Sequence, residues 1–275
     1  MSLTPWLKFA GNVIHLEELP ELLERSNLLK PLFRRLMIES CVQGVEVSRE
    51  EQVKYHRSFL SAKSIDSPEK LTKWLKENDL TEDQASKNIY DSLRIDRFKE
   101  TRFGPEVEKV FLETKNQRDR VVYSLLRLKD PQAAEELYLR LSEGDATFTD
   151  LCNEHSGGFE RETGGLIGPI PLGRLHPKLA ELLRVSQLGQ LWPPVQIDDW
   201  WVITRLDKQL PAQLDASMEL LIRNECFESW LHDQVNRFMA AYRTSLASQD
   251  QSATVDEVPS DPVLQSLSDL VGSED

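Results

Sequence analysis

The sequence predicts an α+β protein, because segments with helical periodicity flank a shorter stretch that has the pattern of a small sheet. Over residues 1–117 apolar side chains recur at helical spacing, interrupted by serine and threonine capping signals. From Val121 to Arg127 the chain becomes apolar and β-branched, as in a central strand. From Leu214 a long helical pattern returns.

The first 117 residues are expected to be helical throughout. Apolar spacing from Leu19 to Val42 predicts a pair of helices or one interrupted helix, and Gly44 stops it. Ser48 and Glu51 form a capping-box pattern, in which the side chain of each residue accepts a hydrogen bond from the backbone amide of the other. Similar signals place further helix starts at Ser67-Pro68, Thr81 and Gly104-Pro105.

The next ninety residues are expected to fold around a small sheet. After the strand at 121–127 we expect two helices, a glycine-rich turn with a short strand, a third helix and a final hairpin. In order, these are a helix from Pro131 to about Gly144, a helix at 147–155, the turn at 164–168, a helix from Pro177, and strands at 191–196 and 200–206.

Composition excludes several classes of function. The chain has 275 residues, 40% hydrophobic and 29% charged, and a net charge of −13, which argues against binding nucleic acid. Seven acidic residues and no basic one follow Arg243, and removing their charge from −13 leaves −6 for the rest. No stretch approaches the length of a membrane span, and the N-terminus lacks the pattern of a secretion signal, so we expect a cytoplasmic protein.

The cysteines and histidines predict neither a disulfide framework nor a metal site. Cys41, Cys152 and Cys226 are far apart and odd in number, which suits reduced thiols. The five histidines show no ligand spacing, and no cofactor is expected.

Five landmarks between Phe148 and Leu206 resemble those of parvulin-type peptidyl-prolyl isomerases. They are Phe148–Ser156 for F-x-x-L-A-x-x-Y/F-S, Gly164–Gly168 for G-G-D-L-G, Leu175–Leu179 for M-x-P-x-F, Leu188–Val195 for x-G-E-I-S-x-P-V, and Trp200–Leu206 for G-Y-H-I-I-K-V. The resemblance implies the parvulin fold, a four-stranded sheet with helices, and peptidyl-prolyl cis-trans isomerase activity.

Parvulins resemble one another in carrying two histidines on adjacent strands, a Cys or Asp between them, and a Met/Phe pocket for the proline ring. Carried over by position, the three polar groups fall on Ser124, Gly158 and Trp201, so none keeps its identity. The pocket is better preserved, and its expected substrate-binding residues are Leu166, Leu175, His176 and Leu179. We therefore expect weak or lost catalysis beside a retained apolar site.

Other side chains offer two alternatives at this site. His155 and His176, with Ser156 and Ser124 as hydroxyl partners, could replace the missing groups, or they could be a packing residue and a surface residue. Trp200 and Trp201 must face opposite sides of their strand, so one can enter the pocket. In the family register the tryptophan that enters the pocket is Trp201. Its role there is either structural or that of an aromatic contact for client chains.

The helical part resembles the N-terminal domain of SurA/PrsA-type chaperones, in the phrases Leu71–Gln84 and Ile89–Ile95. The resemblance implies a platform for extended apolar segments, although the same stripes would also form an ordinary bundle. It further implies that a C-terminal helix packs back onto the N-terminal bundle. The expected domains are 1–117 (helical), 118–208 (parvulin-like), 209–243 (the returning helix) and 244–275 (an acidic disordered tail).

The function expected from these features is a foldase or holdase for unfolded, proline-containing polypeptides, such as export-bound clients. The alternatives are an active isomerase with a rearranged site and an inactive scaffold that binds one dedicated protein partner. Within the tail, Asp261–Val271 has a cap, an early proline and apolar residues on one helical face. This segment either docks on the body or a partner as an amphipathic helix, or is a solvated end.

Overall fold

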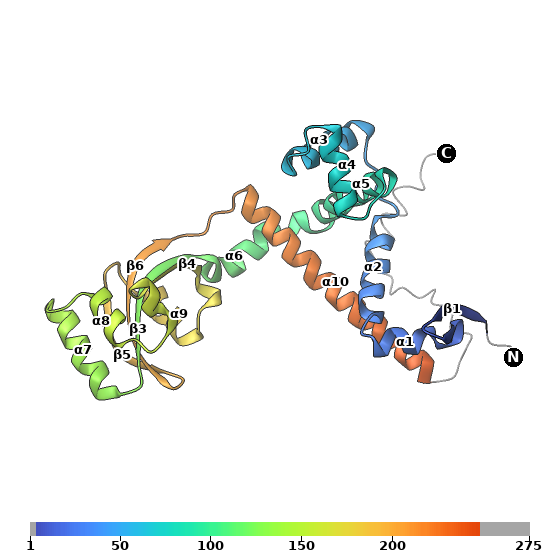
Figure 1. The fold of residues 1–275 in the computed structure, drawn as a ribbon. Helices are drawn as coiled ribbons and strands as arrows, with labels where there is room; N and C mark the ends of the chain where they lie inside the picture. Colours follow the sequence, from blue (N-terminus) through green and yellow to red (C-terminus); the bar gives the residue numbers. More distant parts are fainter. Residues whose placement is uncertain (1–3, 248–275) are drawn as a thin grey trace. The chain divides into compact units, whose positions relative to one another are not determined.

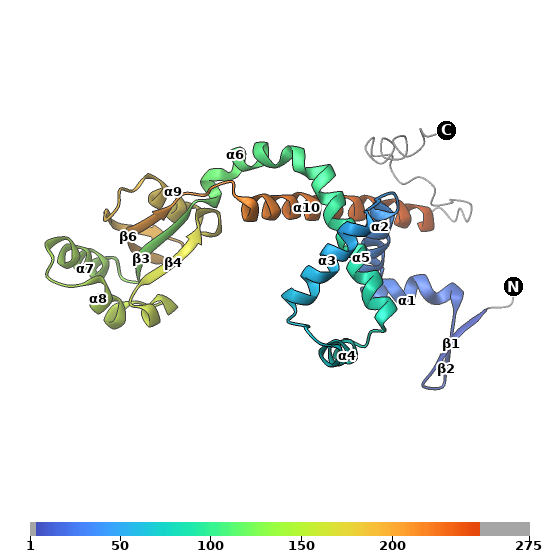
Figure 2. The same ribbon diagram turned by 90° about the horizontal axis from the view of Figure 1, so that it is seen from above.

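The computed structural model describes residues 4–247, which fall into two compact units (Figures 1 and 2). The helical unit comprises the chain up to Val107 together with the chain from Glu219, and the sheet unit comprises Glu108–Met218. The domain borders expected from the sequence, after residues 117 and 208, stay predictions. The acidic tail lies outside the described residues apart from its first few positions.

The helices of the helical unit begin where the capping signals predict. The Ser48 hydroxyl accepts a hydrogen bond from the Glu51 amide at 3.2 Å, and the Glu51 carboxylate accepts one from the Ser48 amide at 3.0 Å. Thr81 and Gln84 form a second reciprocal pair. The elements are α1 (Leu19–Arg25), α2 (Leu29–Val42), α3 (Arg49–Ala62), α4 (Pro68–Glu77), α5 (Glu82–Phe103) and α10 (Ala216–Ala247), which enters this unit at Glu219. The pair of helices expected at 19–42 is confirmed.

The expectation that the first 117 residues contain only helix is wrong. Strands β1 (Pro5–Phe9) and β2 (Asn12–His15) form an antiparallel hairpin. Its turn residues Ala10 and Gly11 both have positive φ, 49° and 82°, as in the tight turn that matches the twist of two strands. Glycine takes this conformation without steric cost, so Ala10-Gly11 closes a hairpin that the search for helical periodicity overlooked.

The core of the helical unit joins the two ends of the chain. Phe98 and Phe103 of α5 contact Phe227 and Trp230 of α10, with ring centroids 5.8–6.2 Å apart. The ring pairs of this cluster are all edge-to-face or tilted, and none is the face-to-face sandwich that aromatic rings avoid. The buried members of this core are Leu29, Met37, Cys41, Phe98, Phe103, Phe227, Leu231, Val235 and Met239. The expected return of the C-terminal helix onto the N-terminal bundle is confirmed.

The sheet unit has one antiparallel sheet of four strands in the order β4-β3-β6-β5. Central β3 is paired on both sides and almost wholly buried, as its apolar β-branched sequence predicts. The strands are β3 (Arg120–Leu128), β4 (Leu166–Pro171), β5 (Leu191–Ile197) and β6 (Trp200–Leu210), and the helices are α6 (Val107–Arg118), α7 (Pro131–Glu143), α8 (Phe148–His155) and α9 (Pro177–Val185). The expected fold class and order of elements are confirmed.

Helices cover both faces of this sheet, with α9 on one side and α7 and α8 on the other (Figure 2). Alternation along β3 separates two clusters, because successive side chains of a strand point to opposite faces. Val121, Tyr123 and Leu125 pack toward α9, on what we call the α9 face. Leu126 and Leu128 pack toward α7 and α8, on the α7/α8 face.

Among residues 4–247, no helix combines the length and the apolar character that crossing a membrane requires.

Candidate functional site

The candidate site is the α9 face of the sheet unit. Strand β3 contributes Tyr123 and strand β6 contributes Val202, and both side chains are buried. Leu175 precedes α9 and Leu179 lies in its first turn, so that both leucines pack against the same cluster. Pro177 at the first helical position sets the start of α9. Two of the expected pocket residues, Leu175 and Leu179, therefore meet the central strands here.

An ion pair ties the glycine loop that follows α8 to strand β3. The Arg127 guanidinium donates two hydrogen bonds to the Glu160 carboxylate, one of them from Nε to Oε1 at 2.9 Å. The Ser156 hydroxyl donates to the same carboxylate and accepts a hydrogen bond from the Arg127 amide at 3.2 Å. The Gly157 amide donates to the Arg127 carbonyl at 2.9 Å. Residues 156–160 are thereby held along the edge of the site.

The carboxylate of Glu160 is fully ionised at neutral pH despite its burial. Its residue is 1% exposed, and burial raises the pKa of a carboxyl. The hydrogen bonds from Arg127 and Ser156 outweigh burial, so the pKa of Glu160 lies below its ordinary value of 4.5. The same pairing raises the pKa of Arg127. The positive charge of Arg127 is therefore matched inside the protein.

Two aromatic rings flank the guanidinium of Arg127. Its Cζ atom lies 5.2 Å from the ring centroid of Phe159 and 5.8 Å from that of Trp200. The Lys129 ammonium lies 3.9 Å from the Trp200 centroid, within the range of a cation–π interaction. Phe159 is 79% exposed, so this edge of the site presents an aromatic surface to solvent.

Tyr123 supplies a neutral hydroxyl to the α9 face. Burial raises the pKa of Tyr123 to about 12, with an opposing effect of the Arg127 charge and a further rise from Glu160. The phenol is consequently protonated throughout the physiological range and can donate a hydrogen bond.

Ser124 and Trp201, predicted at the catalytic positions, lie on the opposite face. The Ser124 hydroxyl donates to Asp207 Oδ2 at 2.7 Å, and Trp201 packs in the cluster beneath α7 and α8. Successive side chains of a strand point to opposite faces, so a predicted position that is one residue off falls on the wrong face of the sheet. When the pattern G-Y-H-I-I-K-V is aligned with Trp200–Leu206, its histidine corresponds to Val202 and not to Trp201. The side chains that face Leu175 and Leu179 are thus those of Tyr123 and Val202.

The third predicted position, Gly158, lies in the loop beside the ion pair. A Cβ atom there would lie 2.0 Å from Arg127 Nη2 and 2.3 Å from Glu160 Oε2. Neither a Cys nor an Asp side chain therefore fits at Gly158 while the pair is in place. The glycine is explained by the space that the ion pair occupies.

The remaining candidates lie around the edge of the unit. His155 ends α8 with its Nε2 3.5 Å from Glu154, and His176 caps α9, its Nδ1 accepting a hydrogen bond from the Lys178 amide at 3.2 Å. Leu166 pairs with Ser124 across β3 and β4 and is exposed. A substrate role for Leu166 and His176 stays a prediction.

Sequence reasoning missed Tyr123, Arg127 and Glu160. The first two share the alternating positions of β3 with Val121 and Leu125, and this period of two could have placed them together. Glu160 gave no such signal, because a carboxylate in a polar loop usually faces water.

Comparison with known proteins identifies this region. Residues 127–208 match the family model Rotamase, described as PPIC-type PPIASE domain. No curated protein sequence matches the chain.

Similar solved structures include two described as peptidylprolyl isomerase PrsA. That from Bacillus anthracis is 16% identical, with 89% of this chain and 98% of that chain covered and a TM-score of 0.42. That from Bacillus cereus is 17% identical, with 96% and 98% covered and a TM-score of 0.43. A Campylobacter jejuni structure, from work that describes PEB4 and Cj1289 as SurA-like chaperones, is 13% identical, with 91% and 100% covered and a TM-score of 0.35. Because these identities and TM-scores are low, the family assignment rests on the match of residues 127–208 to the domain model.

The match covers much of the α9 face, since the matched residues include Arg127, Glu160, Leu175, Leu179 and Val202, whereas Tyr123 precedes them. Residues 127–208 of this chain therefore match a PPIC-type peptidyl-prolyl isomerase domain, the domain of parvulin type.

Proposed function

We propose that the protein is a foldase of the peptidyl-prolyl isomerase family that binds unfolded, proline-containing polypeptides and turns them over weakly or not at all. The observation that carries the proposal is the composition of the α9 face. Its apolar part holds Leu175, Leu179 and Val202, whereas the family's histidine positions hold no imidazole. Residence in the cytoplasm, with export-bound chains among the clients, belongs to the proposal and is checked by cell fractionation.

The chemistry of prolyl isomerisation supports weak turnover. The reaction needs no covalent intermediate, but only stabilisation of a twisted amide against a barrier of about 18–20 kcal/mol. Hydrogen bonds made in the transition state are typically worth a factor of about 10² or more each. On the α9 face the Tyr123 phenol can donate one such bond, while the guanidinium of Arg127 is already bound by Glu160. Binding of a proline ring needs less, because apolar contact suffices.

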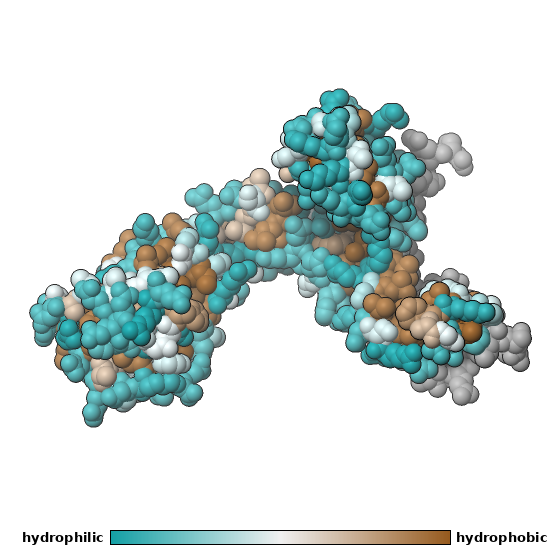
Figure 3. Space-filling view, viewed as in Figure 1, coloured by the Kyte–Doolittle hydropathy of each residue, from teal (hydrophilic) through white to brown (hydrophobic). Residues whose placement is uncertain are grey.

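Exposed leucines on the helical unit support a role in holding clients. Leu28, which precedes α2, and Leu32 and Leu36 within it follow one another at intervals of four residues, the spacing of one helical face. They are 53%, 39% and 49% exposed. Figure 3 shows apolar side chains reaching the surface over α1, α2 and the hairpin. A contiguous apolar surface of this kind is typical of sites that bind other polypeptides.

A protease-coupled assay with proline tetrapeptides tests turnover. We expect a rate indistinguishable from that of the uncatalysed reaction, and the same rate for Tyr123→Phe. A clear acceleration that Tyr123→Phe abolishes would instead establish an active isomerase with a rearranged site.

Suppression of aggregation, measured with several unrelated unfolded proteins, tests client binding. We expect the wild-type chain to delay aggregation of most of them, and the triple variant Leu28→Ser, Leu32→Ser, Leu36→Ser to lose at least half of this effect. The matched control is Arg35→Ser with Glu39→Ser, which removes an exposed ion pair from the same helix. If the wild-type chain delayed the aggregation of none of these clients, the result would favour an inactive scaffold that binds one dedicated partner.

A further inference from the structure

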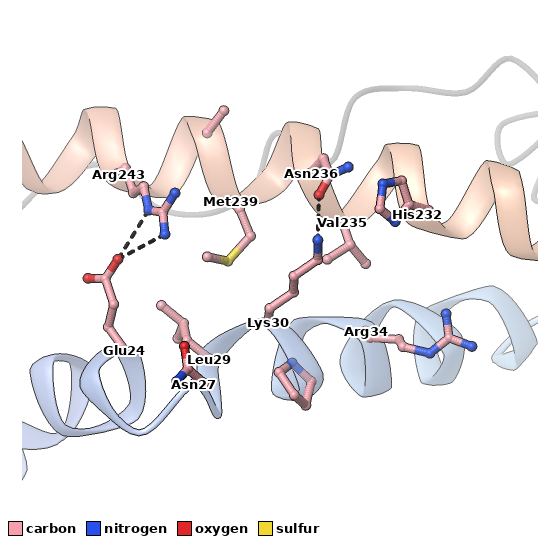
Figure 4. A pocket seen from close by; sticks show the side chains of 12 residues that line it. Glu24, Asn27, Leu29, Lys30, Arg34, His232, Val235, Asn236, Met239 and Arg243 are labelled. Carbon is pink, nitrogen blue, oxygen red and sulfur yellow. Dashed lines mark hydrogen bonds and ion pairs between the residues drawn. The ribbon is translucent and has the colours of Figure 1, made fainter. Parts of the chain in front are cut away.

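A groove in the helical unit is bounded by α1 and α2 on one side and α10 on the other (Figure 4). Its volume is about 610 Å³. Leu29 of α2 and Val235 and Met239 of α10 form an apolar floor, and all three are buried members of the core of this unit. The groove lies apart from the α9 face and belongs wholly to the helical unit.

The rim of this groove is mainly cationic. Lys30 donates to the amide oxygen of Asn236 at 2.9 Å, a neutral acceptor. Arg34 pairs with Glu228 at 2.9 Å and Arg243 pairs with Glu24 at 3.0 Å (Figure 4 shows the latter pair). Both pairs are about half exposed, and such surface pairs contribute little and exchange readily for another carboxylate.

This combination of apolar floor and cationic rim distinguishes the groove from a second hollow. That hollow, on α3, is lined by three cations and Glu50, but Val53 is its one large apolar side chain. An amphipathic acidic segment would therefore be bound by the α10 groove and not by the hollow on α3.

We propose that the segment Asp261–Val271 of this same chain, which lies outside the described residues, docks in the α10 groove. Its sequence predicts a helix with a single apolar face, and every one of the seven charged residues after Arg243 is acidic. The rest of the chain has a net charge of −6 and on average repels an acidic segment, so a cationic rim gives this segment a favourable place to bind. The segment that the sequence left unassigned thus acquires a partner of complementary polarity and charge.

The connection between segment and groove is short enough to favour this occupant. Helix α10 ends at Ala247 and itself forms one wall of the groove. At 1.5 Å per residue, Arg243 lies about 6 Å and Val235 about 18 Å from that end along the helix. Residues 248–260 reach up to about 43 Å when extended. A tether of this length gives an effective concentration in the millimolar range, so even a weak contact is populated.

Hydrogen exchange in the full-length chain tests the docking. We expect the amides of residues 264–271 to exchange at least tenfold more slowly than in a synthetic peptide of residues 252–275. Leu267→Asp, at the centre of the apolar face, should restore the rate of the peptide. The control Gln265→Asp adds the same charge on the opposite face and should leave the protection intact. Neither substitution touches the core of the described residues.

Carbodiimide cross-linking, read by mass spectrometry, tests the location. We expect a bond between the Lys30 ammonium and the carboxylate of Asp261, with a yield that does not change on tenfold dilution. Exchange of the segment at the rate of the free peptide would overturn the proposal. Cross-links mainly to Lys54 of α3, or a yield that falls on dilution and so indicates a second copy, would overturn it as well.

Discussion

The buried pair of Arg127 and Glu160 makes the stability of the sheet unit depend on pH in a way that one substitution should reverse. In Arg127→Met the carboxylate of Glu160 keeps the hydroxyl of Ser156 but loses its counter-charge. Removing one partner of a buried pair typically costs about 3–5 kcal/mol, because the other charge stays buried without compensation. We expect a loss of this size in the free energy of unfolding at pH 7.

As the pH falls, the contribution of Glu160 to the free energy of unfolding should decrease in the wild type and increase in Arg127→Met. In the wild type the folded-state pKa of Glu160 lies below 4.5, so its contribution is complete above that pH and is lost as the pH falls through the folded-state value. In Arg127→Met burial dominates, and the folded-state pKa rises above 4.5. The variant is then least stable at neutral pH and gains stability as Glu160 takes up a proton. The difference between the two should therefore narrow between pH 7 and pH 4.

The converse substitution should be milder. Glu160→Gln leaves a guanidinium whose side chain is 23% exposed and can move toward water, whereas Arg127→Met leaves a carboxylate that is completely buried. We expect the loss of stability with Glu160→Gln to be smaller than with Arg127→Met at pH 7.

Urea denaturation with fluorine NMR of 5-fluorotryptophan provides the measurement. The chain has six tryptophans, and the signals of Trp192 and Trp201 report on the sheet unit separately from the helical unit. The control Arg184→Met removes an exposed pair with Glu181 and should change little at any pH. The reasoning would be refuted if the loss of unfolding free energy in Arg127→Met stayed constant from pH 7 to pH 4. It would also be refuted if Glu160→Gln lost more unfolding free energy at pH 7 than Arg127→Met.

Two further substitutions test the packing of each unit by thermal and urea unfolding. Gly158→Ala should destabilise the sheet unit by about 1–3 kcal/mol, because its methyl group collides with Arg127. Gly104→Ala meets open space at a helical position and should cause no loss of stability, so a comparable loss in both variants would contradict the proposed reason for Gly158. Phe227→Ala should cost the helical unit about 3–5 kcal/mol, because it opens a cavity in the aromatic cluster, whereas Leu221→Ala, at an exposed position of the same helix, should cost much less; comparable losses would mean that α10 does not complete this core.

Local signals were sufficient for most elements. The capping residues Ser48, Ser67 and Thr81 begin helices where expected, and Gly144 with a φ of 79° ends α7 as expected. These features involve neighbouring residues and backbone geometry that any chain must satisfy, so they are readable without the fold. The hairpin around Gly11 escaped notice because its two short strands have too few residues for a clear alternation.

The site shows the limit of such reading. Arg127 and Glu160 are separated by thirty-three positions, and their pairing arises when the loop after α8 folds back along β3. Likewise, the choice between Tyr123 and Ser124 depends on which face of β3 meets α9, and a register error of one residue reverses it.

By itself the sequence determined the helix starts, the strand positions of the sheet unit, the charge distribution and the parvulin-like spacing, because each depends on residues close together in the chain. The tertiary structure alone decided that Tyr123 and Val202 face α9 and that Arg127 is neutralised by a buried carboxylate. It also showed which side chains of α10 complete the core begun by α2 and α5. These are contacts between distant segments, and their energy becomes available only when the chain has brought those segments together.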